Sequence, residues 1–239
     1  MAEAKQVVPS LDGWVFVVNP SSASGHTGGK WPKMLEKFKA AASAKGWRDI
    51  DRVEAVLTSA PSEATDLTRK ALREGATVVV AVGGDGTLSE VVEGFFEPDS
   101  HSTVSPTGVL AFVPSGTGGD FRKSLQWSTS FPEICEHLLG GSVRKVDVGH
   151  VVSSGLSDRT RGTSGRHFIN IASCGSSALI AQIANSSPNL LGSAITFYQA
   201  SVRGLLQYQP RTLWIRVDGG DWQVVCVCVC VCVCVCVCV

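Results

Sequence analysis

The stretch TVVVAVGGDGTLSEVVEGFF, residues 77–96, joins an apolar run to an amphipathic run through a glycine cluster that holds one aspartate. Val78 to Val82 is an apolar run of the kind that forms a strand buried on both faces. GGDG is also good hairpin-turn chemistry, but a hairpin would lead into a second alternating strand. Here the apolar residues that follow have the helical period instead: Leu88, Val91, Val92, Phe95 and Phe96. The stretch predicts a strand, a glycine loop and a helix in series.

Two other segments have the same strand-to-glycine-loop order. VVNPSSASGHTGG, residues 17–29, follows a predicted strand at 14–18, and VPSGTGGDF, residues 113–121, follows one at 109–113. A fourth strand is expected at 52–57. Strands that alternate with helices predict an open, mostly parallel α/β sheet with helices on both faces. Loops at the carboxyl ends of such strands converge on the ligand crevice, so the three loops predict one cradle for phosphate groups.

The expected helices lie between these strands. Pro32 suits the first turn of one helix, and Pro61-Ser62 opens another that stops at Gly75. A further helix contains Ile134 to Leu139. This alternation holds to about Asp147, so an α/β domain is predicted over residues 1–147.

The pattern changes after Asp147. Extended segments at 143–152 and 167–173, a helix at about 190–207 and a hairpin at 212–225 predict a second, antiparallel β-rich domain. We place this partial domain at residues 148–223. Its unfinished sheet is expected to leave an open edge and exposed apolar surface.

Residues 224–239 are a low-complexity tail of alternating valine and cysteine. As a strand, the tail would put its valines on one face and its cysteines on the other. As a metal-binding tract, it would lack the paired CxxC spacing and the histidines of ordinary zinc sites. Because a GT dinucleotide repeat also translates as alternating Val and Cys, we expect a gene-model artefact and a second domain cut short. Only Cys135 and Cys174 lie outside the tail, which is typical of an intracellular protein.

The net charge and the hydropathy of the sequence argue against some classes of protein. Lys and Arg number 21, as do Asp and Glu, so the near-zero net charge argues against a nucleic-acid binder held by a basic surface. No secretory signal is visible, and no apolar run of about 18 residues precedes the tail, so we expect an intracellular protein without a membrane span. The histidines are scattered without metal-ligand spacing and predict no site: His26, His101, His137, His150 and His167.

The ordered set NPSSASG at 19–25, GGDGTLSE at 83–90 and PSGTGGDF at 114–121 resembles the diacylglycerol kinase catalytic-domain family. That family includes sphingosine, ceramide and bacterial lipid kinases. The nearest likeness is to plant long-chain-base kinases, and it extends over about residues 13 to 223. The resemblance implies an NAD kinase/diacylglycerol kinase-like fold whose first domain binds nucleotide and whose second binds lipid. It also implies ATP and Mg²⁺ as cofactors and transfer of the γ-phosphoryl group to a lipid hydroxyl.

The resemblance also implies residue roles. Asp85 is expected to act as the catalytic base that faces the acceptor hydroxyl or as part of the Mg²⁺ shell, and the alternative is a turn-forming residue only. Thr58 and Glu90 are expected to contact the nucleotide and to brace the loop, with simple capping as the alternative. The remaining residues expected to line the nucleotide phosphates are Asn19, Ser21, Ser22, Ser24, Gly25, Gly83, Gly84, Gly86, Thr87, Ser115, Gly116 and Thr117.

Some positions depart from the family pattern. The third loop usually reads GTGNDFAR and here reads GTGGDFRK, so Gly119 replaces an asparagine. Animal sphingosine kinases place an acid near the lipid site to pair with the substrate amine, yet no acid occurs from Arg159 to Arg216. Arg122 and Lys123 are interpreted as contacts for phosphate or anionic membrane, or as a solvated face.

A sphingoid long-chain base is the first expected acceptor and diacylglycerol the second. The partners are then ATP, the lipid and, transiently, a membrane surface, with no nucleic acid and a cytoplasmic, peripherally membrane-associated location. NAD kinase shares the GGDG loop, but PSGTGGDF is the lipid-kinase form. The chain as written is expected to be weak or inactive, and a non-catalytic nucleotide-binding fragment is the alternative outside the enzymes.

Overall fold

The computed structural model describes residues 9–98, 100–116, 118–153, 164–187, 193–227 and 230–234. The chain divides after Ile169 into two compact units. The functional division at Asp147 stays a prediction, because a packing unit does not establish which part binds nucleotide or lipid.

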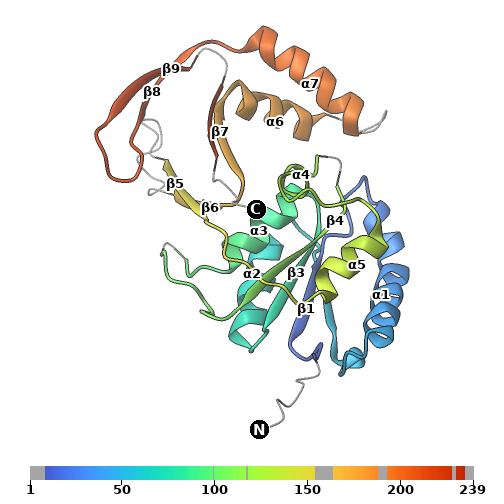
Figure 1. The fold of residues 1–239 in the computed structure, drawn as a ribbon. Helices are drawn as coiled ribbons and strands as arrows, with labels where there is room; N and C mark the ends of the chain where they lie inside the picture. The colour runs from blue at the N-terminus through green and yellow to red at the C-terminus, as the bar shows by residue number, and fades with distance from the viewer. Residues whose placement is uncertain are drawn as a thin grey trace. The chain divides into compact units, whose positions relative to one another are not determined.

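The first unit contains a parallel four-stranded sheet. Its strands are β1 (Trp14–Val18), β2 (Glu54–Leu57), β3 (Val78–Gly83) and β4 (Val109–Pro114), in the order β2-β1-β3-β4 (Figure 1). β1 is central and aligns Val17 with Ala81 of β3 and with Val56 of β2. A 3₁₀ turn, Ile50–Arg52, precedes β2. The predicted open, mostly parallel α/β sheet is confirmed.

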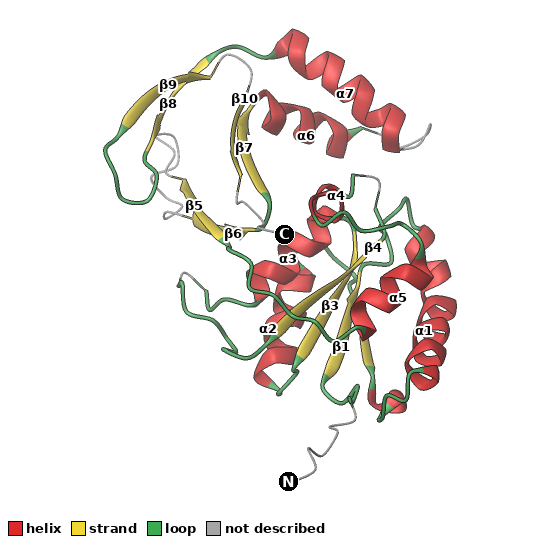
Figure 2. Ribbon diagram, viewed as in Figure 1, coloured by secondary structure: helices red, strands yellow, loops and turns green. Residues whose placement is uncertain are grey.

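Helices cover both faces of this sheet. α1 (His26–Ala44) and α5 (Phe131–Leu139) pack on the face that presents Phe16, Val18 and Val80. α2 (Glu63–Arg73) and α3 (Asp85–Gly94) pack on the other face, which presents Val15, Val17 and Val79 (Figure 2). Because β1 and β3 are buried on both faces, each reads as a continuous apolar run.

Two helices of the first unit differ from the sequence prediction. α1 begins at His26, so Pro32 lies inside the helix and not in its first turn. The early start follows from contacts of that first turn: Thr27 is buried and bonded to Ser22, and Gly28 lies against Pro20. A short helix, α4 (Asp120–Ser124), was not predicted.

A hairpin completes the described part of the first unit. β5 (Gly149–Ser153) pairs with β6 (Ser164–Phe168) in antiparallel register, with His150 opposite His167. This hairpin packs against α3 through hydrogen bonds from His167 to Glu93.

The second unit mixes helices with antiparallel strand pairs. Its elements are β7 (Ile171–Gly175), α6 (Ser176–Ser186), α7 (Ser193–Gln207), β8 (Arg211–Ile215), β9 (Gln223–Val227) and β10 (Cys230–Cys234). β8 pairs with β9, and β7 pairs with β10. The antiparallel expectation is confirmed, whereas α6 was not predicted. Part of the Val-Cys tail forms strand, and its origin as an artefact stays a prediction that the coding DNA tests.

Helix α7 has exposed apolar side chains. Phe197, Tyr198 and Leu206 are 57%, 71% and 82% exposed. Such exposure was expected of an unfinished second domain.

Within the described ranges, no helix has both the length and the hydropathy that crossing a membrane requires.

The α2–α3 contact depends on a glycine. A Cβ at Gly94 would fall 2.5 Å from the Thr68 Cβ and 2.6 Å from the Thr65 carbonyl oxygen. We predict that Gly94→Ala lowers the free energy of unfolding by about 1–3 kcal/mol, because the two helices must separate. The matched control is Gly29→Ala in α1, where a Cβ has nothing within 4 Å and should stabilise the helix by about 0.5–1 kcal/mol. Equal urea-unfolding midpoints for the two variants would contradict this.

Candidate functional site

The order of the strands indicates where a ligand site of this sheet is expected. From β1 the chain crosses to β2 on one side, and from β2 it returns past β1 to β3 on the other. The crevice between the carboxyl ends of β1 and β3 is therefore the topological switch point, where open α/β sheets bind ligands. The N-termini of α1 and α3 begin at this same edge. In α1 the first three N–H groups donate to carbonyl oxygens of the preceding loop: His26 to Ala23, Thr27 to Ser22 and Gly28 to Pro20. The first turn of α3 has N–H groups without a partner inside the helix.

The first loop turns sharply into α1. Ala23, Ser24 and Gly25 have φ values of 52°, 58° and 84°, so three consecutive residues are left-handed. The Asn19 side chain holds the start of the loop, since its Oδ1 accepts a hydrogen bond from the Ser21 N–H at 3.0 Å. Left-handed non-glycine residues are costly and persist only where surrounding contacts impose them.

Hydrogen bonds fasten the three loops to one another. Asn19 Nδ2 donates to Thr87 Oγ1 at 3.0 Å, which joins the first loop to the second. The Thr27 and Ser115 hydroxyls lie 2.6 Å apart, which joins the first to the third. The Ser115 N–H donates to the Gly83 carbonyl oxygen at 2.6 Å, which joins the second to the third. The three loops are therefore joined into one hydrogen-bonded structure, and its use as a phosphate cradle stays a prediction.

Two glycines allow the loops to approach this closely. A Cβ at Gly116 would lie 2.6 Å from the Gly84 Cα, a backbone atom that cannot move aside. A Cβ at Gly83 would lie 2.4 Å from Thr87 Oγ1. Gly116 is therefore required by contact with the backbone of the second loop, and Gly83 by contact with the Thr87 side chain.

Asp85 holds the third loop. Its Oδ2 accepts hydrogen bonds from the Gly119 and Asp120 N–H groups at 2.8 and 3.3 Å, and its Oδ1 accepts one from Phe121 at 3.4 Å. These amides form the first turn of α4, so Asp85 caps a helix 34 residues away in the sequence. A Cβ at Gly118 would lie 2.9 Å from the same Oδ2.

The departure at Gly119 has a conformational reason. Gly119 is the N-cap of α4 and has φ 63° and ψ 40°. Glycine and asparagine are the residues that adopt this left-handed conformation most readily, so either one fits the position. Arg122 and Lys123 make local contacts, since Arg122 donates to the Trp127 carbonyl oxygen at 2.7 Å and Lys123 pairs with Asp120 at 3.0 Å.

The remaining predicted residues lie around the cradle. Thr58 is buried at the end of β2, and its N–H donates to the Val18 carbonyl oxygen at 2.9 Å. Glu90 lies on α3 and accepts a hydrogen bond from the Ser62 N–H at 3.0 Å, which caps α2. Gly86 is exposed in the first turn of α3. Thr117 lies outside the described residues.

The structure therefore brings together, by direct hydrogen bonds or backbone contact, Asn19, Ser21, Ser22, Gly83, Gly84, Asp85, Thr87, Ser115 and Gly116. Ser24 and Gly25 continue the same loop, whereas Thr58 and Glu90 make their contacts at neighbouring elements. Sequence reasoning missed Thr27, whose buried hydroxyl bonds both Ser22 and Ser115. The feature of the sequence that could have indicated Thr27 is its position between the glycines of the first glycine-rich loop.

This arrangement suits a polyanion. The dipoles of α1 and α3 and the N–H groups in the first turn of α3 would supply partial positive charge to a bound phosphate without a fixed cation. The amides of Gly25 and Gly28 are bonded within the first loop. The donor set also fits Mg²⁺, which proteins bind through one or two carboxylates together with substrate phosphates. Asp85 is the carboxylate within the cradle, and three amide bonds leave about one of its four acceptor positions.

The fold is that of an open α/β protein, and its three loops form a candidate phosphate site at the switch point. The family model of the diacylglycerol kinase catalytic domain matches residues 13–151, more than half of the chain. The chain belongs to this family.

Relatives and solved structures agree with that assignment. The chain is 27% identical to a diacylglycerol kinase of Staphylococcus aureus (strain bovine RF122 / ET3-1), with 87% of the chain and 58% of the relative covered. It is also 27% identical to a diacylglycerol kinase of Staphylococcus saprophyticus, with 70% of the chain and 48% of the relative covered. The chain thus spans about half the length of the curated relatives it matches.

A solved structure supports the fold. The crystal structure of a diacylglycerol kinase from Bacillus anthracis str. Sterne matches with a TM-score of 0.56 at 20% identity, covering 89% of this chain and 60% of that one.

Glu63 makes the loop after β2 sensitive to pH. Its carboxylate accepts hydrogen bonds from the Ser59 N–H and hydroxyl and from the Ala60 N–H, and these bonds lower the pKa of Glu63 below its ordinary 4.5. The stabilisation is therefore present above pH 4.5 and is lost as pH falls through the lowered pKa.

We predict that Glu63→Gln lowers the melting temperature at pH 7 and that the difference from wild type shrinks below pH 4.5. Glu36→Gln, an exposed change on α1, should show no such trend. A Glu63→Gln deficit that stays constant with pH would contradict the assignment.

Proposed function

We propose that this chain supplies the nucleotide-binding part of an ATP- and Mg²⁺-dependent kinase that transfers the γ-phosphoryl group to a lipid hydroxyl. The observation that carries the proposal is the fastening of three glycine loops into one cradle at the β1–β3 switch point. Family membership supports it, as does the match to relatives named diacylglycerol kinases over 70–87% of the chain.

The cradle has a defined task in this reaction. In phosphoryl transfer an acceptor oxygen bonds to the γ-phosphorus while the bond from that phosphorus to the leaving oxygen breaks, and the acceptor hydroxyl loses its proton. Little covalent chemistry is required of the protein, so positioning and charge stabilisation provide most of the catalysis. The amides near Asn19, Gly83 and Ser115 would hold the phosphates in place, and Mg²⁺ would offset their charge.

Asp85 is the proposed catalytic residue. Its three amide contacts fix the carboxylate between the second and third loops. The remaining acceptor position can take a Mg²⁺-bound water or the acceptor hydroxyl itself. We favour the metal shell, because a carboxylate among phosphate-binding amides is repelled by phosphate unless a cation lies between them.

The acceptor is proposed to be a sphingoid long-chain base, on the resemblance to plant long-chain-base kinases. Diacylglycerol is the second candidate, because the relatives are named diacylglycerol kinases. The lack of an acid from Arg159 to Arg216 also favours an acceptor without an amine. Either lipid requires transient contact with a cytoplasmic membrane surface, and the exposed Phe197, Tyr198 and Leu206 of α7 are suited to such contact.

The proposal is tested by measuring labelled γ-phosphate transfer to sphingosine, diacylglycerol and NAD in parallel. The assay uses this chain and the product of the transcript re-sequenced beyond Gln223. We predict label in a lipid, with Asp85→Asn lowering kcat by roughly 10²-fold or more. Label in NAD alone would contradict a lipid kinase, and full activity in Asp85→Asn would remove Asp85 from the chemistry.

Two readouts separate the roles of Asp85. A metal-shell role predicts that Asp85→Asn raises the Mg²⁺ concentration needed for half-maximal rate, whereas a base role predicts loss of the acidic limb of the pH–rate profile. Asp51→Asn is the matched control, since Asp51 is exposed in the 3₁₀ turn that precedes β2, at the amino ends of the strands, and pairs with Lys39 at 3.5 Å. It carries the same change of charge and should retain activity.

A further inference from the structure

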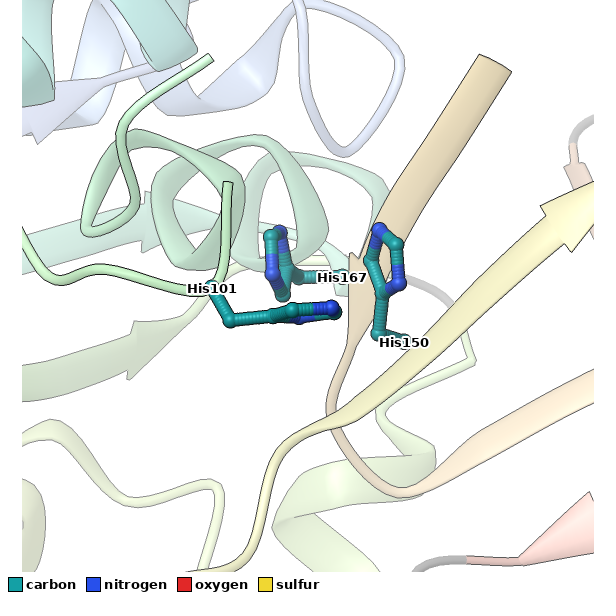
Figure 3. A group of neighbouring side chains, drawn as sticks. All are labelled: His101, His150 and His167. Carbon is teal, nitrogen blue, oxygen red and sulfur yellow. The ribbon is translucent and has the colours of Figure 1, made fainter. Parts of the chain in front are cut away.

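Three histidines that lie far apart in the sequence come together beside α3. His101 lies in the connection from α3 to β4, His150 on β5 and His167 on β6 (Figure 3). One ring nitrogen of each lies within 4.8 Å of the others. The sequence spacing did not indicate this cluster, which forms because the β5–β6 register sets His150 opposite His167 and the connection returns beside them.

His167 is the most constrained of the three. It is 4% exposed, and its ring stacks on Phe96 with centroids 3.8 Å apart and planes 7° from parallel. Glu93 Oε2 accepts a hydrogen bond from the His167 backbone N–H at 2.7 Å and lies 3.3 Å from His167 Nδ1. A carboxylate on Nδ1 places the ring proton there and leaves the lone pair on Nε2.

Within the described part of the chain, His167 Nε2 is a buried nitrogen that lacks a hydrogen-bond partner. A buried polar atom left unsatisfied costs about 1–3 kcal/mol. A metal ion bound through the lone pair would satisfy it, and the Glu93–His167 pair matches the carboxylate–histidine arrangement found behind zinc ligands.

The other two rings face the same place. The His150 ring centroid lies 4.5 Å from that of His167 and 4.6 Å from that of His101. Gly165 makes room for it, since a Cβ there would fall 2.3 Å from His150 Nε2. The turn that carries His101 is closed on both sides by hydrogen bonds, from the Glu97 N–H to Ser102 at 2.9 Å and from the Val104 N–H to Phe95 at 2.8 Å.

The geometry is close to that of a three-histidine zinc site. Imidazole nitrogens bound at about 2.0–2.1 Å in a tetrahedron lie roughly 3.3 Å apart. The observed separations reach 4.8 Å, and the exposed His101 side chain can rotate inward to shorten them. Imidazole ligands suit zinc and its neighbours in the periodic table, whereas Mg²⁺ and Ca²⁺ require oxygen ligands.

We propose that His101, His150 and His167 bind one divalent transition-metal ion of the Zn²⁺ type, with Glu93 orienting His167. Glu93 is near the C-terminus of α3, whereas Asp85 begins that helix, so eight residues, or roughly 12 Å, separate the site from the phosphate cradle. The ion is therefore distinct from the Mg²⁺ of the kinase reaction. Its effect would be to fasten the β5–β6 hairpin to the α3–β4 connection.

Ring-specific NMR tests the site. The chain has five histidines, so selective ¹⁵N-histidine labelling reports every ring, and His26 and His137 serve as internal controls. Because the thiols of the tail also bind Zn²⁺, the titration is run on two proteins. One is the full chain, and the other is the full chain in which every cysteine from Cys226 to Cys238 is changed to serine, called the serine chain below. We expect one equivalent of Zn²⁺ to shift the rings of His101, His150 and His167 together in the serine chain. Unmoved rings, or shifts of His26 and His137 with the same midpoint, would overturn the proposal.

Variants of the serine chain measure how much individual residues contribute to Zn²⁺ affinity. Glu93→Gln should weaken Zn²⁺ binding by roughly 10–100-fold, as expected for a residue that orients a ligand. His101→Gln removes an exposed ligand without disturbing buried packing, and it should abolish the joint shift of the other two rings. His137→Gln on α5 is the matched control and should leave the affinity unchanged. Unchanged affinity in both Glu93→Gln and His101→Gln would contradict the assignment.

Discussion

The structure of the candidate site depends on hydrogen bonds that cross between loops, in addition to those within the first loop. Asp85 is central to them, because a single carboxylate at the start of α3 organises three amides at the start of α4. Asn19–Thr87 and Thr27–Ser115 complete the connections. Each loop is short and rich in glycine, so none would hold its conformation alone against the entropy of the unfolded chain.

The sheet makes these connections possible. β1 and β3 are adjacent and parallel, so their carboxyl ends bring Asn19 and Gly83 to the same edge, and β4 brings Ser115 beside them. The approach of Gly116 to Gly84 then leaves no room for a Cβ at Gly116. The glycines of the sequence motifs thus have a packing role as well as a place near the ligand, and the two roles point to the same residues.

Much of the fold could be predicted from the sequence. Val78 to Val82 and Trp14 to Val18 are buried on both faces and read as apolar runs, which is why their strands and the parallel sheet were foreseen. α4 was not, because it has five residues and is capped by Asp85 from another loop. The start of α1 was misplaced, since Thr27 is fixed by Ser22 and Ser115 and not by a local helix signal.

The two sites differ in how visible they are in the sequence. The phosphate loops are contiguous motifs, so most of their residues could be named in advance, although Thr27 joins them only through the fold. His101, His150 and His167 come from three separate segments, and only the return of the β5–β6 hairpin to α3 brings them together. No spacing rule could have indicated them, because the convergence is a property of tertiary structure.

The central claim is that three loops act as one nucleotide cradle. Amide hydrogen exchange in the presence of Mg²⁺-ATP tests it most directly, because the loops carry separate amides in separate peptides. The account predicts that exchange slows at residues 19–25, 83–87 and 115–121 together, with one midpoint in nucleotide concentration. Protection of one loop without the other two, or no protection in any of them, would contradict it.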